Sequence, residues 1–196
     1  MKRLFLALTL EPDLAARLAR VAPGLEPECG ALTPYSAEDL HLTLSFLGEI
    51  EDEHVAGVIR SAAEEFRGLW APELELTGEL ELLPIGAETP SALAAVVSEV
   101  GDRQGRLGAL RNRAQQVGLS RRCPGHRADR RREYRPHVTL AQLLDGPPAP
   151  LGDLDSGITR QWLGGEIALF ESPPRSAPGS PRYRQLMSWG LAVDPG

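Results

Sequence analysis

The stretch of sequence that decides the fold is Leu40-His41-Leu42-Thr43-Leu44-Ser45-Phe46-Leu47-Gly48. Apolar and polar residues alternate along its first part, which is typical of a β-strand with one buried face. We expect a strand over residues 40–47 that Gly48 ends. His41 and Thr43 then point together to the open face. Strict alternation places Phe46 on the opposite, buried face, unless the strand bends or ends before it.

The same tetrad occurs again in the second half of the chain, as His137-Val138-Thr139-Leu140. It begins a predicted strand over residues 138–144, so an imidazole again lies beside a hydroxyl on one face. If two similar halves pack around a pseudo-twofold axis, all four polar side chains meet in one cleft. A neutral and a protonated histidine can then accept one proton and release another in a single displacement. The threonine hydroxyls can donate hydrogen bonds to phosphate oxygens.

The rest of the chain alternates predicted strands and helices. Further strands are expected over residues 3–10, 74–83, 92–97, 166–170 and 183–193, and helices over residues 12–21, 51–66 and 102–117. In the third helix, Asp102 is the expected N-cap and Gly118 the stop. Links rich in Pro and Gly or Ser cover residues 146–157 and 172–181. This mixture, with hairpin-like neighbours, favours an α+β fold over a doubly wound parallel sheet.

Length and composition favour one soluble domain over residues 1–196, because a chain of 196 residues can bury a core without disulfide or metal staples. Its apolar runs are shorter than the roughly 20 residues that cross a bilayer, so no membrane span is expected. We also expect a cytoplasmic location. Cys29 and Cys123 are too few for a disulfide framework, and acidic residues directly follow the short apolar run at the N-terminus.

The net charge of −6 argues against broad binding to nucleic acid, which depends on many cationic side chains. Any phosphate site must therefore be local. Seven arginines gather between residues 121 and 135, and this segment is either an exposed loop or a contact for RNA. Cys123 and His126 have the spacing of only half a zinc site. The sequence contains neither a glycine-rich phosphate loop nor a carboxylate cluster for magnesium, so we expect no metal and no cofactor. His54 is expected on a helix surface.

The paired H-x-T-x motifs resemble those of the 2H phosphoesterase superfamily, and the chain is similar to its RNA 2',3'-cyclic phosphodiesterase branch, also called 2'-5' RNA ligase-like. Phe46 completes that branch's first motif, H-x-T-x-x-F. Residues 3–8 at the start, and Glu171-Ser172, Gly179 and Tyr183 near the end, are similar too. The resemblance implies a bilobal α+β fold with two pseudo-twofold-related antiparallel sheets, outer helices and a central cleft. The first lobe would hold residues 41–43 of the motif, and the second lobe residues 137–139.

The resemblance also implies a reaction, the hydrolysis of RNA 2',3'-cyclic phosphate ends to 2'-phosphomonoesters. His41 would be the general acid that protonates the departing ribose O3', and His137 the general base that accepts a proton from water. Thr43 and Thr139 would hold the non-bridging phosphate oxygens, and Phe46 would stack on the terminal base. The expected partners are RNA 3' ends or nucleotides with a 2',3'-cyclic phosphate, bound by a monomer without metal.

One position departs from the pattern of this branch. Its second motif reads H-x-T-x-x-R, with an arginine that binds phosphate, whereas this chain has Gln142 there. A glutamine can donate a hydrogen bond to phosphate, but it lacks the charge and the two-pronged geometry of arginine. We expect Gln142 still to line the phosphate site, and Arg135 or Arg182 to supply the missing cation.

Two alternatives rest on the same residues. In a 2'-5' RNA ligase, which runs the reverse reaction, an RNA 5'-hydroxyl replaces water and a 2',5' linkage forms. In an RNA-end binding protein of the 2H type, catalysis is weak or lost because Gln142 replaces the motif arginine. The two intact H-x-T motifs argue against binding alone, because binding does not need two groups that carry protons.

Overall fold

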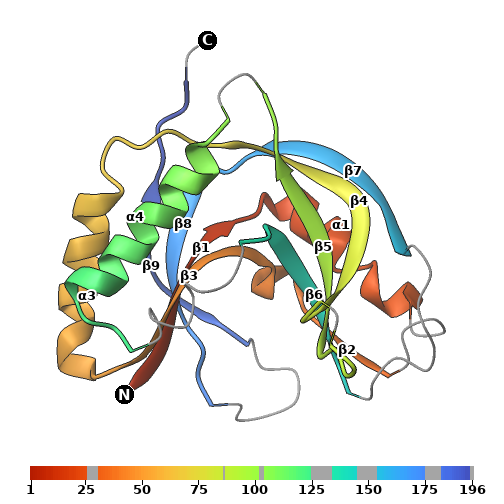
Figure 1. Cartoon of the computed structure of the whole chain (residues 1–196), viewed down its shortest axis with the longest axis horizontal. Coiled ribbons are helices and arrows are strands. Elements are labelled where there is room, and N and C mark those ends of the chain that lie inside the picture. Colours follow the sequence, from red (N-terminus) through yellow and green to blue (C-terminus); the bar gives the residue numbers. More distant parts are fainter. Residues whose placement is uncertain are drawn as a thin grey trace.

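The computed structural model describes residues 1–25, 31–85, 87–101, 104–124, 134–144, 154–174 and 182–194 (Figure 1). Several sequence features lie outside these ranges, namely Cys29, Asp102, His126, Gly179, Arg127, Arg130, Arg131, Arg132 and most of both Pro-rich links. The predictions of half a zinc site and of an arginine-rich contact for RNA, which depend on these residues, therefore stay predictions.

Strands and helices alternate along the chain much as predicted. The strands are β1 (Lys2–Thr9), β2 (Leu32–Pro34), β3 (His41–Ile50), β4 (Glu73–Leu83), β5 (Ala92–Glu99), β6 (His137–Leu143), β7 (Leu154–Leu163), β8 (Glu166–Glu171) and β9 (Arg184–Gly190). The α-helices are α1 (Pro12–Leu18), α3 (Asp52–Glu65) and α4 (Arg106–Ser120), and two 3-10 turns are η1 (Ala22–Leu25) and η2 (Ala37–Asp39). The predicted α+β class is confirmed.

The named strands pair antiparallel in one nine-stranded sheet, in the order β7-β4-β5-β6-β3-β1-β8-β9, with β2 beside β6. At its centre, β3 and β6 pair at Leu42 and Val138 alone. This narrow join separates a five-stranded half, made of β7, β4, β5, β6 and β2, from a four-stranded half, made of β3, β1, β8 and β9 (Figure 1). The two sheets that the resemblance implies are therefore halves of one continuous sheet. Each half has a histidine motif on its innermost strand.

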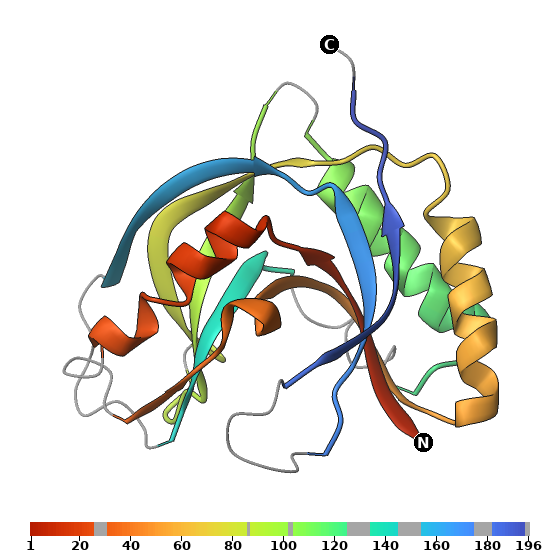
Figure 2. The ribbon, with the colours of Figure 1, turned by 180° about the vertical axis from the view of Figure 1, so that it is seen from behind.

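The helices lie on different halves of the sheet. α3 packs on α4, and α4 packs on β3, beside the half that contains β1, β8 and β9 (Figure 1). Their buried apolar residues recur every three or four positions, as in amphipathic helices: Val58 and Ala62 in α3, and Leu107, Leu110, Ala114 and Val117 in α4. α1 lies within the curve of the other half (Figure 2). Among the described residues, no helix combines the length and the apolar character needed to cross a membrane.

Two predicted glycine stops are wrong. Gly48 does not end its strand, because β3 continues to Ile50. Gly48 has a φ of 83° where the register between β1 and β3 shifts, and glycine adopts this left-handed backbone without a steric penalty. It therefore forms part of an irregularity within the strand. Gly118 does not end α4, which continues to Ser120 with Gly118 buried.

The start of α4 and two strands also differ from the prediction. α4 begins at Arg106 with Gly105 as its N-cap residue, so the prediction of Asp102 as the N-cap is wrong. The Glu99 carboxylate, at the end of β5, accepts hydrogen bonds of 3.0 Å from the backbone N–H groups of Gly105 and Leu107. These bonds satisfy N–H groups that a helix start leaves free. β2 was missed because it is only three residues long. β7 was missed because it begins within the Pro- and Gly-rich link.

Candidate active site

The two histidine motifs match in backbone shape as well as in sequence. On β3, the register against β1 skips Leu44, and on β6, the register against β5 skips Leu140. Each skipped leucine directly follows the motif threonine, so both strands have a β-bulge at the same place. A bulge inserts one residue into a strand and thereby shifts the alternation of the side chains that follow.

The bulges decide which side chains share a face with the histidines. After each extra leucine, the next residue, Ser45 or Ala141, is fully buried. The residue after that turns outward again. Phe46 is therefore 49% exposed, on the face of the first histidine, and the interpretation of Phe46 as a core residue is wrong. Gln142, at the matching position, is half-buried on the face of the second histidine. Strict alternation misplaced Phe46 because it takes no account of an inserted residue.

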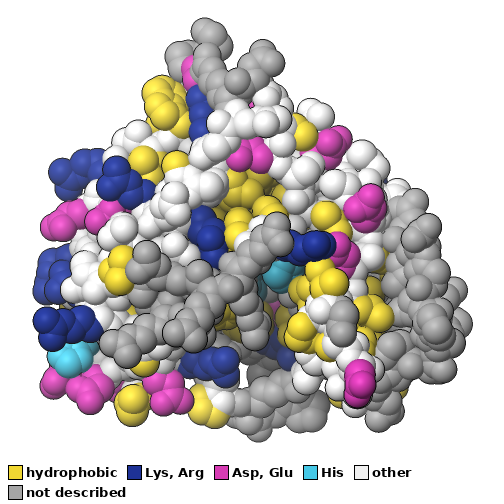
Figure 3. Space-filling model, viewed as in Figure 1, with side chains coloured by type: hydrophobic (Ala, Val, Ile, Leu, Met, Phe, Trp, Pro, Cys, Tyr) yellow, Lys and Arg dark blue, Asp and Glu magenta, His cyan; other side chains and the backbone are white. Residues whose placement is uncertain are grey.

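The two motifs meet where the halves of the sheet join. Leu42 and Val138, the pair that links β3 to β6, are fully buried. Their sequence neighbours point to the opposite face, so both histidines and both threonines lie together there. His41 and His137 are close enough that a charge on His137 lowers the pKa of His41. In the space-filling view of Figure 3, a histidine side chain is visible near the centre of the molecule, among basic and hydrophobic side chains.

A backbone carbonyl two residues earlier orients each histidine. Nδ1 of His41 lies 2.7 Å from the carbonyl oxygen of Asp39, and Nδ1 of His137 lies 2.8 Å from that of Arg135. Because a carbonyl oxygen only accepts hydrogen bonds, each Nδ1 carries a proton and donates it. In the neutral ring, Nε2 is then the unprotonated nitrogen. It is the atom that can exchange a proton with a ligand.

Aromatic rings surround His41. Its ring centroid lies 4.8 Å from that of Phe5, 5.5 Å from that of Phe170 and 5.0 Å from that of Tyr183. Burial lowers the pKa of His41 from 6.5 to about 4, although the hydrogen bond to Asp39 and the negative charge of Asp39 oppose this shift. His41 is therefore neutral at pH 7 in the ligand-free protein.

The motif threonines are half-buried beside the imidazoles. Within the described ranges, no hydrogen bond occupies the hydroxyl of Thr43 or Thr139, so both can donate to a ligand. The carbonyl of Thr43, at the bulge of β3, accepts a hydrogen bond of 3.0 Å from the hydroxyl of Tyr134. Tyr134 lies just before β6, so this bond ties the first motif to the segment that carries the second.

The two predicted cations differ in their surroundings. Nη1 of Arg182 donates to Oε1 of Gln142 over 3.5 Å, and the guanidinium lies 4.1 Å from the centroid of the Tyr35 ring. Nη2 of Arg182 is buried and has no hydrogen-bond partner among the described residues. Arg135 instead forms an exposed ion pair of 3.0 Å with Glu81. Of the two arginines, Arg182 is therefore the one that lies at the second motif, and its Nη2 can still donate a hydrogen bond to an anion.

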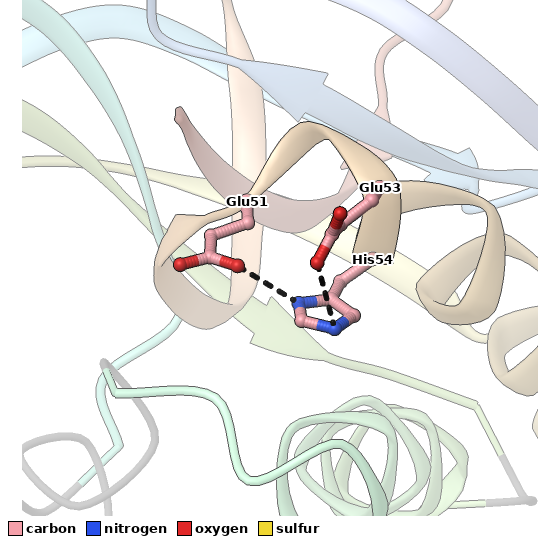
Figure 4. A group of neighbouring side chains, drawn as sticks. All are labelled: Glu51, Glu53 and His54. Atoms are coloured by element: carbon pink, nitrogen blue, oxygen red, sulfur yellow. Dashed lines mark ion pairs between the residues drawn. The ribbon is translucent and has the colours of Figure 1, made fainter.

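Away from the motifs, the described residues include one group that could hold a metal ion, formed by Glu51, Glu53 and His54 (Figure 4). All three are exposed, and the ring nitrogens of His54 lie 3.7 Å and 3.8 Å from the two carboxylates. This agrees with the surface position predicted for His54. Cys123 is buried, and burial raises the pKa of its thiol, which disfavours the thiolate that binds zinc.

Sequence reasoning missed Asp39 and Phe170, which contact the first histidine, and Tyr35, whose ring lies against the guanidinium of Arg182. Asp39 is 4% exposed, and its carboxylate accepts hydrogen bonds from the backbone of residues 182 and 183. Asp39 and Tyr35 precede the first motif closely, and this proximity was the one available signal. Phe170 lies on β8, which is far away in sequence, so the pattern of residues offered no sign of its contact.

This chain resembles one protein family in its first half and several solved structures over nearly its whole length. The sequence profile of the family described as LigT like Phosphoesterase matches residues 8–78, which contain the first motif. The crystal structure of TT0787 from Thermus thermophilus has a TM-score of 0.74 and 25% identity, over 96% of this chain and 97% of that one. Escherichia coli LigT complexed with 3'-AMP has a TM-score of 0.67 and 23% identity, over 97% and 98% of the two chains. No curated protein matches the sequence.

The fold is that of LigT-like phosphoesterases, a class of the 2H phosphoesterase superfamily. The family match and the structural neighbours together support an enzyme of the phosphoesterase or ligase type.

Proposed function

We propose that this protein is a metal-independent 2H phosphoesterase that hydrolyses RNA 2',3'-cyclic phosphate ends to 2'-phosphomonoesters. The observation that carries this proposal is the pair of matched, bulged strands. Each strand turns the Nε2 of a histidine and the hydroxyl of a threonine toward the same face. Two proton carriers suit a displacement at phosphorus, because the attacking water loses a proton while the leaving oxygen gains one.

In the proposed reaction, His137 accepts a proton from water as the water oxygen bonds to phosphorus. The bond from phosphorus to O3' breaks, and His41 donates its Nε2 proton to O3', which leaves the phosphate on O2'. His41 is neutral in the ligand-free protein, so it must gain this proton as the substrate binds. The negative charge of the cyclic phosphate favours the imidazolium, because an opposite charge nearby raises the pKa of a histidine.

Thr43 and Thr139 would donate hydrogen bonds to the non-bridging phosphate oxygens as charge develops on them. Gln142 would donate through its amide, since its Oε1 already accepts a bond from Arg182. Arg182 would supply the positive charge that the second motif lacks, and its unpartnered Nη2 supports this role. Arg135 is the weaker candidate, because Glu81 neutralises it.

The proposed partner is an RNA 3' end or a nucleotide with a 2',3'-cyclic phosphate. Phe46 supports this choice, because an exposed aromatic ring on the face of the motifs can stack on the terminal base. The complex of E. coli LigT with 3'-AMP concerns a protein of the same fold that binds a nucleotide. No metal is proposed, since imidazoles and hydroxyls supply the proton transfer and the charge stabilisation.

The proposal is tested by incubating the purified protein, in EDTA, with an RNA oligomer that ends in a 2',3'-cyclic phosphate. The position of the phosphate in the product is then identified by phosphorus NMR. We expect a 2'-phosphomonoester, at a rate that EDTA does not change. A cyclic end that is bound and stays intact would contradict hydrolysis and identify an RNA-end binding protein. A 2',5'-linked product, formed when RNA with a 5'-hydroxyl is added, would identify a ligase.

A further inference from the structure

Asp39 is a buried carboxylate that the proposed reaction does not use. It is 4% exposed, and such a charge is rarely buried without partners. Its Oδ2 accepts a hydrogen bond of 2.9 Å from the hydroxyl of Ser36. Its Oδ1 accepts the backbone N–H groups of Arg182, at 2.8 Å, and Tyr183, at 3.2 Å. The carboxylate therefore holds a segment that is remote in sequence and leads into β9.

The two residues that Asp39 holds both contribute to the candidate active site. The guanidinium of Arg182 contacts Gln142 of the second motif. The ring of Tyr183 meets the His41 ring edge-on, with the centroids 5.0 Å apart. The Asp39 carboxylate thus fixes the backbone that places the Arg182 cation at the second motif and the Tyr183 ring at the first.

Asp39 also acts on His41 directly. Its own carbonyl oxygen accepts the Nδ1 proton of His41, and its negative charge opposes the loss of the imidazolium. His137 on β6 has the opposite effect on the charge of His41. Tyr183 contacts the ring from the residue just before β9, while Phe5 on β1 and Phe170 on β8 contribute apolar rings.

We propose that Asp39 is a positioning residue that couples the two motifs: its carbonyl orients His41, while its carboxylate anchors Arg182 beside Gln142. The inference rests on the proposed function, because it concerns the same phosphate site. The competing view is that Asp39 merely stabilises the fold. In that case its loss would lower stability but leave the properties of the folded site unchanged.

Three variants separate these views. Asp39→Asn keeps the shape, because its Oδ1 can still accept the two backbone N–H groups and its amide can donate to Ser36, but it removes the charge. Asp39→Ala removes all three hydrogen bonds. Ser36→Ala is the matched control, since it removes one hydroxyl and leaves the carboxylate bound to residues 182 and 183.

The first measurement is the titration of His41 by proton NMR, which requires no reaction. We expect Asp39→Asn to lower the pKa of His41 by about one unit, because an opposite charge within a few ångströms shifts a pKa by that amount or more. Ser36→Ala should leave the pKa within a few tenths of the wild-type value. An unchanged pKa in folded Asp39→Asn would overturn the electrostatic part of the proposal.

The second measurement is the affinity for inorganic phosphate, followed by NMR. We expect Asp39→Ala to weaken phosphate binding about tenfold, as expected for the loss of a charge-assisted contact. In an Arg182→Ala background, the same change should have little further effect, because the anchored cation is already absent. Additive losses in the double variant would overturn the anchoring role. If Asp39→Ala does not fold, the phosphate affinity of Asp39→Asn is compared with that of Arg182→Lys, in which the Asp39 carboxylate still holds the backbone of residue 182.

The two measurements also distinguish this inference from the proposed function. If the wild-type protein binds no phosphate, the proposed function is wrong, and so is the proposal that Asp39 anchors Arg182 for phosphate binding. The His41 titration still decides whether Asp39 tunes the imidazole. If phosphate binds and cyclic ends are cleaved while all Asp39 variants behave like the wild type, the function stands and Asp39 is structural.

Discussion

At the scale of single residues, the proton content of the two histidines controls the proposed chemistry. One ring must be protonated and the other neutral when the substrate reacts. Burial among aromatic rings favours the neutral form of His41 and lowers its pKa to about 4. A charge on His137 also lowers the pKa of His41, so the two rings interact.

This proton balance predicts the acidic limb of the pH profile. Below about pH 4, His41 becomes protonated, the pair loses the neutral imidazole of His41, and kcat/KM should fall about tenfold per pH unit. The measurement is kcat/KM for a cyclic-phosphate dinucleotide between pH 3 and 8, with circular dichroism as a control for folding. An acidic limb at the ordinary histidine value of about 6.5 would show that His41 is not the perturbed group of the pair.

Arg182 should matter more for substrate binding than Arg135. We expect Arg182→Ala to raise KM tenfold or more, because a hydrogen bond to a charged group contributes about 1.5–3 kcal/mol. Arg135→Ala should change KM less than about twofold, since exposed ion pairs contribute little. Gln142→Arg in the Arg182→Ala background should restore binding. Full activity in both alanine variants would refute the idea of a compensating arginine.

At the scale of elements, the β-bulge is the feature that builds the site. It lets three side chains of one strand point to the same face, although the second lies two positions after the first and the third lies three positions after the second. The bulge of β3 also has an unfavourable effect, because it turns the side chain of Ser45 into the core. Its hydroxyl is fully buried and has no hydrogen-bond partner in the described structure. The matching position on β6 is Ala141, which is equally buried.

The unsatisfied hydroxyl predicts a stabilising substitution. Ser45→Ala should raise the free energy of unfolding by about 1 kcal/mol, because a buried hydroxyl without a partner costs about 1–3 kcal/mol. Ala141→Ser is the mirror control and should lower the free energy of unfolding by a similar amount. Urea denaturation at neutral pH measures both. Loss of stability in Ser45→Ala would mean that this hydroxyl has a partner, such as a buried water.

The bulges also explain how far the sequence could predict the structure. Periodicity identified α3 and β4 closely, because each buries one face at a regular spacing. β1 was identified by its apolar run, which is buried on both faces, and β3 by the alternation before its bulge. The repeated tetrad identified the histidines and threonines. The outward turn of Phe46 and Gln142 needed the position of an inserted residue, which depends on hydrogen bonding to the neighbouring strand. Arg182 at Gln142, and Asp39 behind it, are long-range contacts that local patterns do not contain.

At the scale of the whole molecule, the two halves of the sheet bring together groups that are far apart in sequence. One pair of buried residues, Leu42 and Val138, joins the halves, and the motifs lie on either side of that pair. The match to the LigT-like family ends at residue 78, before the second motif. It is the fold, shared over nearly the whole chain with the T. thermophilus protein, that places the second histidine beside the first.

In the proposed reaction His41 and His137 act together as acid and base, and the chemistry of the leaving group separates their roles. The measurement is single-turnover cleavage of an RNA 2',3'-cyclic phosphate, and of its 3'-thio analogue, by the wild type, His41→Ala and His137→Ala. A thiolate leaves without a proton from an acid, because thiols have a far lower pKa than alcohols.

We predict that each variant loses about 10²–10⁴-fold on the ordinary substrate. The 3'-thio analogue should restore most of the rate to His41→Ala but not to His137→Ala. If the 3'-thio analogue instead restores the rate of His137→Ala, then His137 is the general acid and His41 the general base. Wild-type rates in either variant would contradict the account.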